Sequence, residues 1–250
     1  MFEKKHICIA HRGYRAKYPE NTIIAFQKAI GVFDMFEFDV QFTKDGVAVV
    51  FHDEDLRRCS DVLEKYDKYK IHELTLEEIK NLDNVSWFIR KNPFDMEINY
   101  KELKKLPLNS IPTLEEVLKF IKKTSFSANL EIKQSVLNQK YIIKYISDMI
   151  EKYSLKEDIL ISSFNHSYLL MIEGFYTAAL FETSKEKLLD YLKKLNVTAY
   201  HISDKYVKDY DVKNLLDNGI YTNVYTVNDK KRRKELFCMG VKGVFCDYVS

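Results

Sequence analysis

The 250-residue chain has few of the residues that interrupt regular structure, with only seven glycines and four prolines. Their scarcity excludes a collagen-like repeat and a long Gly- or Pro-rich linker. Hydrophobic residues make up 46% of the chain and charged residues 30%, a balance that supports a large core and excludes a disordered chain. We therefore expect a single folded domain over residues 1–250.

An excess charge of one sign, paired cysteines and long apolar runs are also missing. The 39 basic and 37 acidic side chains leave a formal charge of +2, which argues against a nucleic-acid partner. No apolar run approaches the about 18 residues of a membrane span, so no transmembrane segment is expected, and the run Ile7–Ala10 is too short for a signal-peptide core. The cysteines show neither C-x-x-C spacing nor zinc-finger spacing, which predicts reduced thiols in a cytoplasmic protein. They are Cys8, Cys59, Cys238 and Cys246.

Short β-type runs alternate with longer segments of helical period, the pattern of parallel strands joined by helices. Nine runs compete for the eight strands of a (β/α)₈ TIM barrel. Val47–Phe51 is the odd one, because only four residues separate it from the preceding run and a parallel crossover needs a dozen or more. We interpret it as the return strand of a hairpin. The other eight are Ile7–Ala10, Met35–Val40, Ala128–Ile132, Ile159–Ser163, Ala178–Phe181, Thr198–Ile202, Asn223–Val227 and Val244–Asp247.

Helices are predicted where apolar residues recur at three- and four-residue steps. Asn138–Tyr153 carries one such stripe, Leu114–Ile121 follows the cap-like Thr113, and Lys185–Leu195 follows Thr183-Ser184. The basic run Lys230–Lys234 is interpreted as a solvated helix face.

Residues from Glu54 to Pro112 form a segment longer than an ordinary barrel loop, which we interpret as a small insertion after the early hairpin. One helical piece is expected near Leu76–Leu82. The aromatic residues of this insertion either form its own small core, which we favour, or a lipid-facing lip. They are Tyr66, Tyr69, Trp87 and Phe88.

Acidic residues alternate with apolar ones on two predicted strands. Glu37 and Asp39 project from one face of their strand, and a two-residue turn at Lys44-Asp45 would place Glu37 opposite His52 and Asp39 opposite Val50. A three-residue turn would shift this register by one. Glu131 shares a strand face with Lys133, and the two either form a simple salt bridge or belong to the same site.

Three carboxylates gathered inside a barrel need a cation to offset their charge. A site made of oxygen atoms, without cysteine or clustered histidine, suits Mg²⁺ or Ca²⁺ better than zinc. His11 and Arg12 end the first strand, where barrel enzymes place functional groups, and they offer a proton carrier and a fork of donors for phosphate. Considered alone, however, His11-Arg12-Gly13 is more often a packing or capping segment.

The order of several short motifs is more informative than any one of them. The sequence resembles the glycerophosphodiester phosphodiesterase family over nearly the whole chain. The blocks that carry the resemblance are His11-Arg12-Gly13, Pro19-Glu20-Asn21-Thr22, Glu37-x-Asp39, Thr43-Lys44-Asp45-Gly46, His52-Asp53, Leu74-Thr75-Leu76-Glu77-Glu78, Ile111-Pro112-Thr113-Leu114-Glu115-Glu116, Glu131-x-Lys133, Ser162-Ser163-Phe164-Asn165, Thr226-Val227-Asn228 and Gly240-Val241-x-Gly243.

The resemblance implies a (β/α)₈ barrel that hydrolyses glycerophosphodiesters, small-molecule substrates, to sn-glycerol 3-phosphate and an alcohol, with one bound divalent metal ion. It implies that His11 and His52 form the acid–base pair and that the metal is held by Glu37, Asp39 and Glu131. It also implies that the substrate is bound by Arg12, Lys133, Glu20 and Tyr225, with Glu20 supporting the metal site as well. Two departures from the family pattern are Val32-Phe33 in place of Gly-Ala and Tyr225 in place of Trp. The second bears on substrate preference.

Two alternatives stay open: a lysophospholipase D acting on lipids, and a barrel that binds phosphate esters without catalysis. The nucleophile is either water or the neighbouring glycerol hydroxyl. The other histidines, His6, His72, His166 and His201, are interpreted as surface or packing residues.

Overall fold

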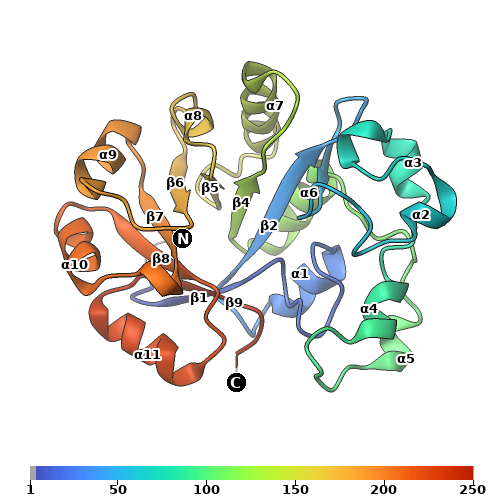
Figure 1. The fold of residues 1–250 in the computed structure, drawn as a ribbon, viewed down its shortest axis with the longest axis horizontal. Helices are drawn as coiled ribbons and strands as arrows, with labels where there is room; N and C mark the ends of the chain where they lie inside the picture. The colour runs from blue at the N-terminus through green and yellow to red at the C-terminus, as the bar shows by residue number, and fades with distance from the viewer. Residues whose placement is uncertain (1–3, 250) are drawn as a thin grey trace.

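The computed structural model describes residues 4–249. Within them, eight parallel strands form a sheet that closes on itself because β1 pairs with both β2 and β9. This confirms the predicted (β/α)₈ barrel, and Figure 1 shows helices around its outside. The parallel strands are β1 (Ile7–Ala10), β2 (Met35–Phe42), β4 (Ala128–Ile132), β5 (Ile159–Ser163), β6 (Tyr176–Phe181), β7 (Ala199–Ser203), β8 (Tyr221–Tyr225) and β9 (Gly243–Cys246).

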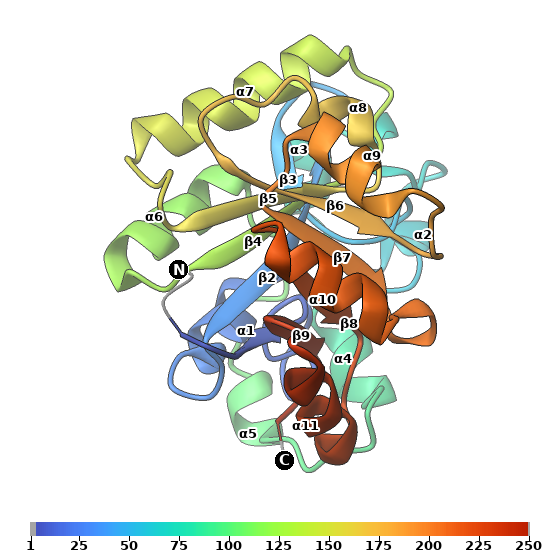
Figure 2. The same ribbon diagram turned by 90° about the vertical axis from the view of Figure 1, so that its left-hand side faces the viewer.

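The outer helices begin mostly at side chains that cap them. Thr113 and Glu116 form the capping box that the sequence predicts at the start of α6, and Asn138 caps α7. Figure 2 shows the helices α6 to α11 following one another around the strands. Their bounds are α1 (Ile23–Ala29), α6 (Leu114–Thr124), α7 (Gln139–Lys152), α8 (His166–Leu169), α9 (Leu188–Leu195), the 3₁₀ turn η2 (Asp204–Tyr206), α10 (Asp209–Asp217) and α11 (Lys230–Met239).

Two helix predictions need correction. Helix α9 begins at Leu188 and not at Lys185, because Lys187 adopts a left-handed backbone conformation, and Thr183-Ser184 therefore do not cap it. The basic run at the start of α11 is not wholly solvated. Arg233 is buried, and its guanidinium donates a hydrogen bond of 2.7 Å to the carbonyl of Asn228. The remaining basic residues of the run are exposed or half-buried.

The hairpin after β2 is present, but its predicted register is wrong by one residue. Strand β3 (Ala48–Val50) pairs with β2 so that Val40 faces Val50 and Phe42 faces Ala48. The reason is a three-residue turn, closed by Gly46 at φ +79° and by the hydroxyl of Thr43, which accepts from the Val47 amide. This turn requires a positive φ, which glycine adopts without strain.

Residues 54–112 fold into short helices whose apolar side chains form a cluster together with Val49 and Phe51 of the hairpin. Trp87 and Phe88 belong to that cluster and Tyr66 and Tyr69 pack against it, which favours the core interpretation of these aromatic residues. In Figure 1 the segment lies to one side of the barrel, next to α1. Its elements are α2 (Val62–Lys65), the 3₁₀ turn η1 (Ile71–Glu73), α3 (Leu76–Lys80), α4 (Ser86–Lys91) and α5 (Tyr100–Leu103).

Side chains along β2 point alternately towards the surrounding helices and into the barrel. Phe36 and Phe38 are fully buried against Phe26 of α1, with ring centroids 4.4 and 6.0 Å away. Losing one of these rings would destabilise the fold by about 3–5 kcal/mol. Glu37 and Asp39, which alternate with these phenylalanines along the strand, consequently point into the barrel.

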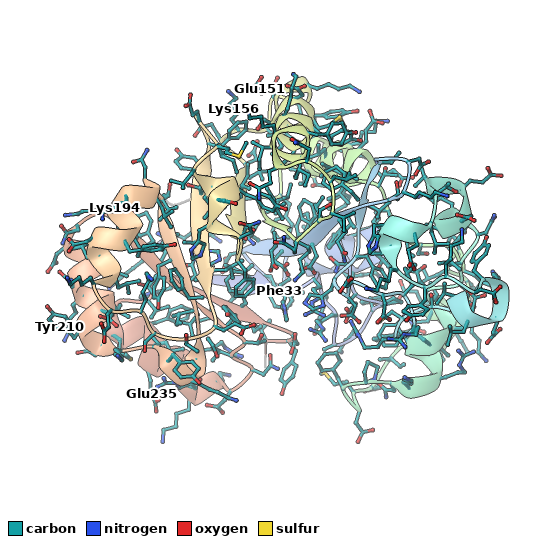
Figure 3. All side chains as sticks on the ribbon, turned by 45° about the horizontal axis from the view of Figure 1, so that its top comes forward. Phe33, Glu151, Lys156, Lys194, Tyr210 and Glu235 are labelled. Carbon is teal, nitrogen blue, oxygen red and sulfur yellow. The ribbon has the colours of Figure 1, made fainter. Side chains whose placement is uncertain are left out.

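Three further features concern the helix surfaces, the length of the helices and the cysteines. Figure 3 shows Lys194, Tyr210 and Glu235 projecting outward from α9, α10 and α11, whereas Phe33 lies inside the molecule. Among residues 4–249, no helix combines the length and apolarity needed to cross a membrane. The four cysteines are free thiols.

Candidate active site

A cavity of about 680 Å³ opens at the carboxyl ends of the barrel strands. Parallel strands end at the same rim, so groups that are distant in the sequence meet there. The cavity contains most of the predicted site residues, namely His11, Arg12, Glu37, His52, Glu131, Lys133 and Tyr225. Asp39 and Glu20 are absent from its described lining and lie behind it, in contact with Arg12.

Glu37, Asp39 and Glu131 converge as predicted. The strand register places Asp39 directly beside Glu131, and each of the three residues has a carboxylate oxygen within 4.8 Å of the others. Their exposures are 3%, 1% and 9%. Burial, together with the charges of Asp39 and Glu131, raises the pKa of Glu37 well above its usual value. The cluster therefore carries negative charge that the protein offsets only in part.

This donor set fits a hard divalent cation. Asp39 Oδ2 accepts a hydrogen bond of 2.8 Å from Asn21 Nδ2, but Asp39 Oδ1 is buried and accepts no hydrogen bond from the described residues. Its nearest described cation is Lys133 Nζ, 3.4 Å away, an ion pair that leaves the oxygen without a hydrogen bond. A buried carboxylate oxygen without a donor is costly, and a bound cation would complete its environment. The three acids supply only oxygen ligands, which Mg²⁺ and Ca²⁺ prefer.

Lys133 and Arg12 approach the same acids from two sides. Lys133 Nζ lies 2.7 Å from Glu131 Oε1 and 3.4 Å from Asp39 Oδ1, so the simple salt bridge considered from the sequence exists within the cluster. The backbone amide of Arg12 donates to Glu37 Oε2 over 2.7 Å, and its guanidinium lies 3.6 Å from Asp39. Although burial acts in the opposite direction, Lys133 is the largest contributor that lowers the pKa of Asp39.

His11 is held by a carboxylate from the other end of the chain. Its Nδ1 lies 2.9 Å from Asp247 Oδ1, and Asp247 Oδ2 accepts from Asn228 Nδ2 over 2.9 Å. Burial and the charge of Arg12 lower the pKa of His11 to about 4, so the imidazole is neutral at pH 7. Arg15 Nη1 lies 3.2 Å from the same ring nitrogen. In the tautomer that donates Nδ1–H to Asp247, the other ring nitrogen can accept a proton.

His52 is arranged in the same way by its sequence neighbour. Its Nδ1 lies 2.6 Å from Asp53 Oδ1, and Arg58 donates to the second oxygen of Asp53 over 2.5 Å. The corrected hairpin register places the backbone of Phe51 opposite Asp39, with the Phe51 amide donating to the Asp39 carbonyl over 3.0 Å. His52, which follows at the end of β3, lines the cavity.

Glu20 belongs to a cluster of arginines. Its carboxylate accepts from Arg12 over 2.9 Å and from Arg58 over 2.6 Å, and it lies 3.3 Å from Arg15. Burial opposes ionisation, but these guanidinium groups together lower the pKa of Glu20 to about 2. Glu20 is therefore a charged anchor for Arg12.

Tyr225 forms part of the aromatic wall of the cavity, together with Phe164 and Phe245. Its ring meets those of Phe164 and Phe245 edge-on, at centroid distances of 6.3 and 6.4 Å. The hydroxyl donates to the carbonyl of Phe181 over 2.7 Å, and this bond fixes the ring. The second departure from the family pattern, Val32-Phe33, is not among the described lining residues of the cavity. Phe33 is buried against Tyr14, with a distance of 5.3 Å between the ring centroids.

Sequence reasoning did not assign the partners of the two histidines. The sequence could have indicated Asp53, since this residue directly follows His52 in one of the family motifs. For Asp247 the only indication was its position at the end of the last strand, and for Asn228 it was the Thr226-Val227-Asn228 motif. Nothing in the sequence around Arg58 indicated a role in the site.

Of the remaining histidines, His201 is fully buried beside Asn223, and His166 contacts Tyr191.

Residues 11–250 match the model of the glycerophosphoryl diester phosphodiesterase family. Two curated relatives, the glycerophosphodiester phosphodiesterases of Bacillus altitudinis and Caldanaerobacter subterraneus subsp. tengcongensis, are each 32% identical to this chain. The matches cover 96% of this chain and 93% of the first relative, and 97% of this chain and 94% of the second.

Solved structures give the same result. A phosphodiesterase of Oleispira antarctica, in complex with the product sn-glycerol-3-phosphate, has a TM-score of 0.80 at 25% identity and covers 96% of this chain and 92% of its own. The glycerophosphodiester phosphodiesterase of Thermotoga maritima has a TM-score of 0.71 at 26% identity, with 97% and 94% covered. The chain therefore belongs to the glycerophosphoryl diester phosphodiesterase family and is an enzyme of that family.

Proposed function

We propose that this enzyme hydrolyses glycerophosphodiesters to sn-glycerol 3-phosphate and an alcohol, with one bound Mg²⁺ or Ca²⁺. The observation that carries the proposal is the meeting of three buried carboxylates and two histidine–carboxylate pairs around one cavity. A family relative bound to sn-glycerol-3-phosphate supports this product. The cytoplasmic location stays a prediction.

Glu37, Asp39 and Glu131 would hold the ion. When bound, it would offset the charge of the phosphate and polarise a phosphoryl oxygen. Lys133 and Arg12 lie at the same place and would bind the anionic substrate, and the guanidinium of Arg12 matches the geometry of phosphate oxygens. Their other contacts, to Glu131 and Glu20, hold both cations in position before substrate arrives.

Hydrolysis of a phosphodiester requires one proton to leave the nucleophile and one to reach the departing alkoxide. Two histidines line the cavity, and each is oriented through Nδ1 by its own aspartate. In this proposal one imidazole accepts the proton of the nucleophile, either water or the neighbouring hydroxyl of glycerol, and the other protonates the alcohol. The carboxylates fix the ring orientations and stabilise the imidazolium form.

The packing of the insertion bears on the lipid alternative. Trp87 is 6% exposed and Phe88 is fully buried in the apolar cluster between the insertion and the hairpin. Tyr66 and Tyr69 are half-buried and pack against the same cluster, and none of the four aromatic residues is among the described lining residues of the cavity. This favours water-soluble glycerophosphodiesters over a lipid substrate for the proposed reaction.

The test is an assay of purified protein on glycerophosphocholine, glycerophosphoethanolamine, bis(glycerol) phosphate and lysophosphatidylcholine, with Mg²⁺, Ca²⁺ or chelator. We expect sn-glycerol 3-phosphate from the soluble diesters in the presence of an ion. Preferential release of choline from lysophosphatidylcholine would favour the lipid alternative. Absence of any phosphodiester cleavage under all conditions would refute the proposal.

A further inference from the structure

One guanidinium lies between the two halves of the proposed catalytic machinery. Arg58 Nε donates to Asp53 Oδ2 over 2.5 Å, and Arg58 Nη2 donates to Glu20 Oε1 over 2.6 Å. Its third nitrogen, Nη1, reaches Glu20 Oε2 over 3.2 Å. All three nitrogen atoms of the group are thus directed at two carboxylates.

Each carboxylate in turn holds a residue that lines the cavity. Asp53 Oδ1, the oxygen that Arg58 does not contact, lies 2.6 Å from Nδ1 of His52. Glu20 accepts a hydrogen bond from Arg12 over 2.9 Å. Arg58 itself is not among the described lining residues of the cavity. Its direct partners near the cavity are the carboxylates of Asp53 and Glu20, so we expect it to act through the groups that they orient.

The insertion supports Arg58 on its other side. The guanidinium carbon lies 5.8 Å from the ring centroid of Trp87, which belongs to the buried cluster of residues 54–112. Trp87 is fixed by its indole N–H, which donates to the carbonyl of Asn84 over 2.9 Å. A continuous path of contacts consequently runs from the core of the insertion to His52 and Arg12.

We propose that Arg58 is a positioning residue through which the insertion holds His52 and Arg12 in their working orientations at the same time. This inference rests on the proposed function, because it concerns the same cavity. The planar fork of arginine spans two carboxylates with fixed directions, whereas a lysine offers a single charged nitrogen. Only an arginine at position 58 satisfies Asp53 and Glu20 together.

The neighbouring arginine provides a matched control. Arg57 also pairs with an aspartate, Asp55, at 2.8 Å, and its guanidinium lies 4.3 Å from the ring centroid of Tyr69. These contacts lie on the surface of the insertion, and the Arg57 side chain is 50% exposed. Arg57→Ala therefore removes the same kinds of contact without touching the cavity residues.

The experiment compares Arg58→Ala, Arg58→Lys and Arg57→Ala by kcat, KM and melting temperature, with and without millimolar ethylguanidinium. Misplacement of reacting groups costs up to about 100-fold in rate, so we expect a roughly 10- to 100-fold lower kcat for Arg58→Ala. Arg58→Lys should lose most of the same activity while melting within a few degrees of the wild type. Arg57→Ala should stay within about twofold of wild type, the range of an exposed ion pair.

Chemical rescue separates positioning from folding. Ethylguanidinium should raise the rate of Arg58→Ala several-fold and leave Arg57→Ala and the wild type unchanged. Equal rates for Arg58→Ala and Arg57→Ala would overturn the inference. So would a loss of activity that follows the folded fraction and is not rescued, or, if Arg58→Ala does not fold, a stable Arg58→Lys with wild-type kcat.

A measurement without turnover distinguishes this inference from the proposed function. In a crystal structure of Arg58→Lys, we expect the His52 ring or the Arg12 guanidinium to lie in a different orientation from the wild type. Unchanged positions of both would contradict the inference. A wild-type protein that cleaves no phosphodiester would refute the proposed function while leaving this structural comparison valid.

Discussion

His11 and Asp247 stand at opposite ends of the chain, yet His11 Nδ1 lies 2.9 Å from Asp247 Oδ1. Closure of the barrel explains the contact, since β1 pairs with β9 and Ala10 faces Cys246 across the two strands. Each element therefore delivers one member of the pair at the same rim. Asn228 holds Asp247 from both sides: its Nδ2 donates to Asp247 Oδ2, and its Oδ1 accepts from the Asp247 amide over 2.8 Å.

The first prediction concerns this pair. Asp247→Asn removes the charge that orients His11 and stabilises its protonated form, so we expect kcat to fall about 10- to 100-fold with little change in melting temperature. Asp229→Asn is a suitable control, because Asp229 caps α11 and asparagine is an equally good cap. Steady-state kinetics on a soluble glycerophosphodiester measures both variants. Full activity of Asp247→Asn would remove the assigned role of the pair.

The two histidines themselves should matter more. We expect His11→Ala and His52→Ala each to lower kcat by roughly 10²- to 10⁴-fold, as loss of a positioned acid or base does. His72→Ala serves as a comparison outside this pair and should retain most activity. The double variant should be little worse than either single one, because the two imidazoles act in one proton-transfer cycle. Near-normal rates in both single variants would contradict the assignment.

Removal of one acid should separate stability from metal binding. Without an ion, burial and the other acids raise the pKa of Glu37, so the stability of the metal-free protein falls as pH rises above the ordinary glutamate range. In chelator at pH 8, Glu37→Gln should therefore have a free energy of unfolding about 1–3 kcal/mol above that of the wild type. This difference corresponds to a melting temperature higher by roughly 2–10 °C. Calorimetry measures the melting temperatures.

Added ion should reverse that ranking. Binding to the folded state stabilises by about 2.7 kcal/mol at one hundred times the dissociation constant. The wild type should gain this stabilisation from Mg²⁺ or Ca²⁺, and Glu37→Gln should gain far less. Equal responses of the two proteins to the ion would show that Glu37 does not contribute to ion binding.

A buried histidine outside the site predicts how stability depends on pH. Burial lowers the pKa of His201 to about 3, whereas the unfolded chain binds the proton near pH 6.5. Its contribution to stability is therefore complete above pH 6.5 and is lost as pH falls towards 3. The full shift corresponds to a few kcal/mol.

His201→Gln tests this linkage, since glutamine can still accept the hydrogen bond of 2.9 Å that Asn223 donates. The variant should lose less melting temperature than wild type between pH 7 and pH 4.5, as measured by circular dichroism. An identical pH dependence in the two proteins would show that His201 is not the group involved.

Local periodicity was sufficient to predict much of the fold. The apolar runs Ile7–Ala10, Ala128–Ile132 and Ile159–Ser163 are strands with the predicted bounds. The acids of the buried carboxylate cluster were also accessible from the sequence, because strand alternation separates Glu37 and Asp39 from the phenylalanines between and around them. Such inferences depend only on neighbours along the chain.

The predictions that were wrong concerned features that depend on contacts between distant parts of the chain or on the conformation of a turn. The hairpin register followed from a turn closed by Gly46 in a left-handed conformation, and composition alone did not choose between turns of two and three residues. The burial of Arg233 results from carbonyl groups of Asn228 and Tyr248 that its own helix does not contain. The partners Asp247 and Arg58 were missed because only the closed barrel and the folded insertion bring them to the histidines.

Phosphorus NMR of glycerophosphocholine incubated with the chelator-treated protein tests the central claim most directly. We predict that the signal of sn-glycerol 3-phosphate appears only after Mg²⁺ or Ca²⁺ is added, and that Asp39→Asn produces none under the same conditions. Formation of product at the same rate in chelator, or by Asp39→Asn, would contradict the assignment of the three carboxylates as the site of an essential ion.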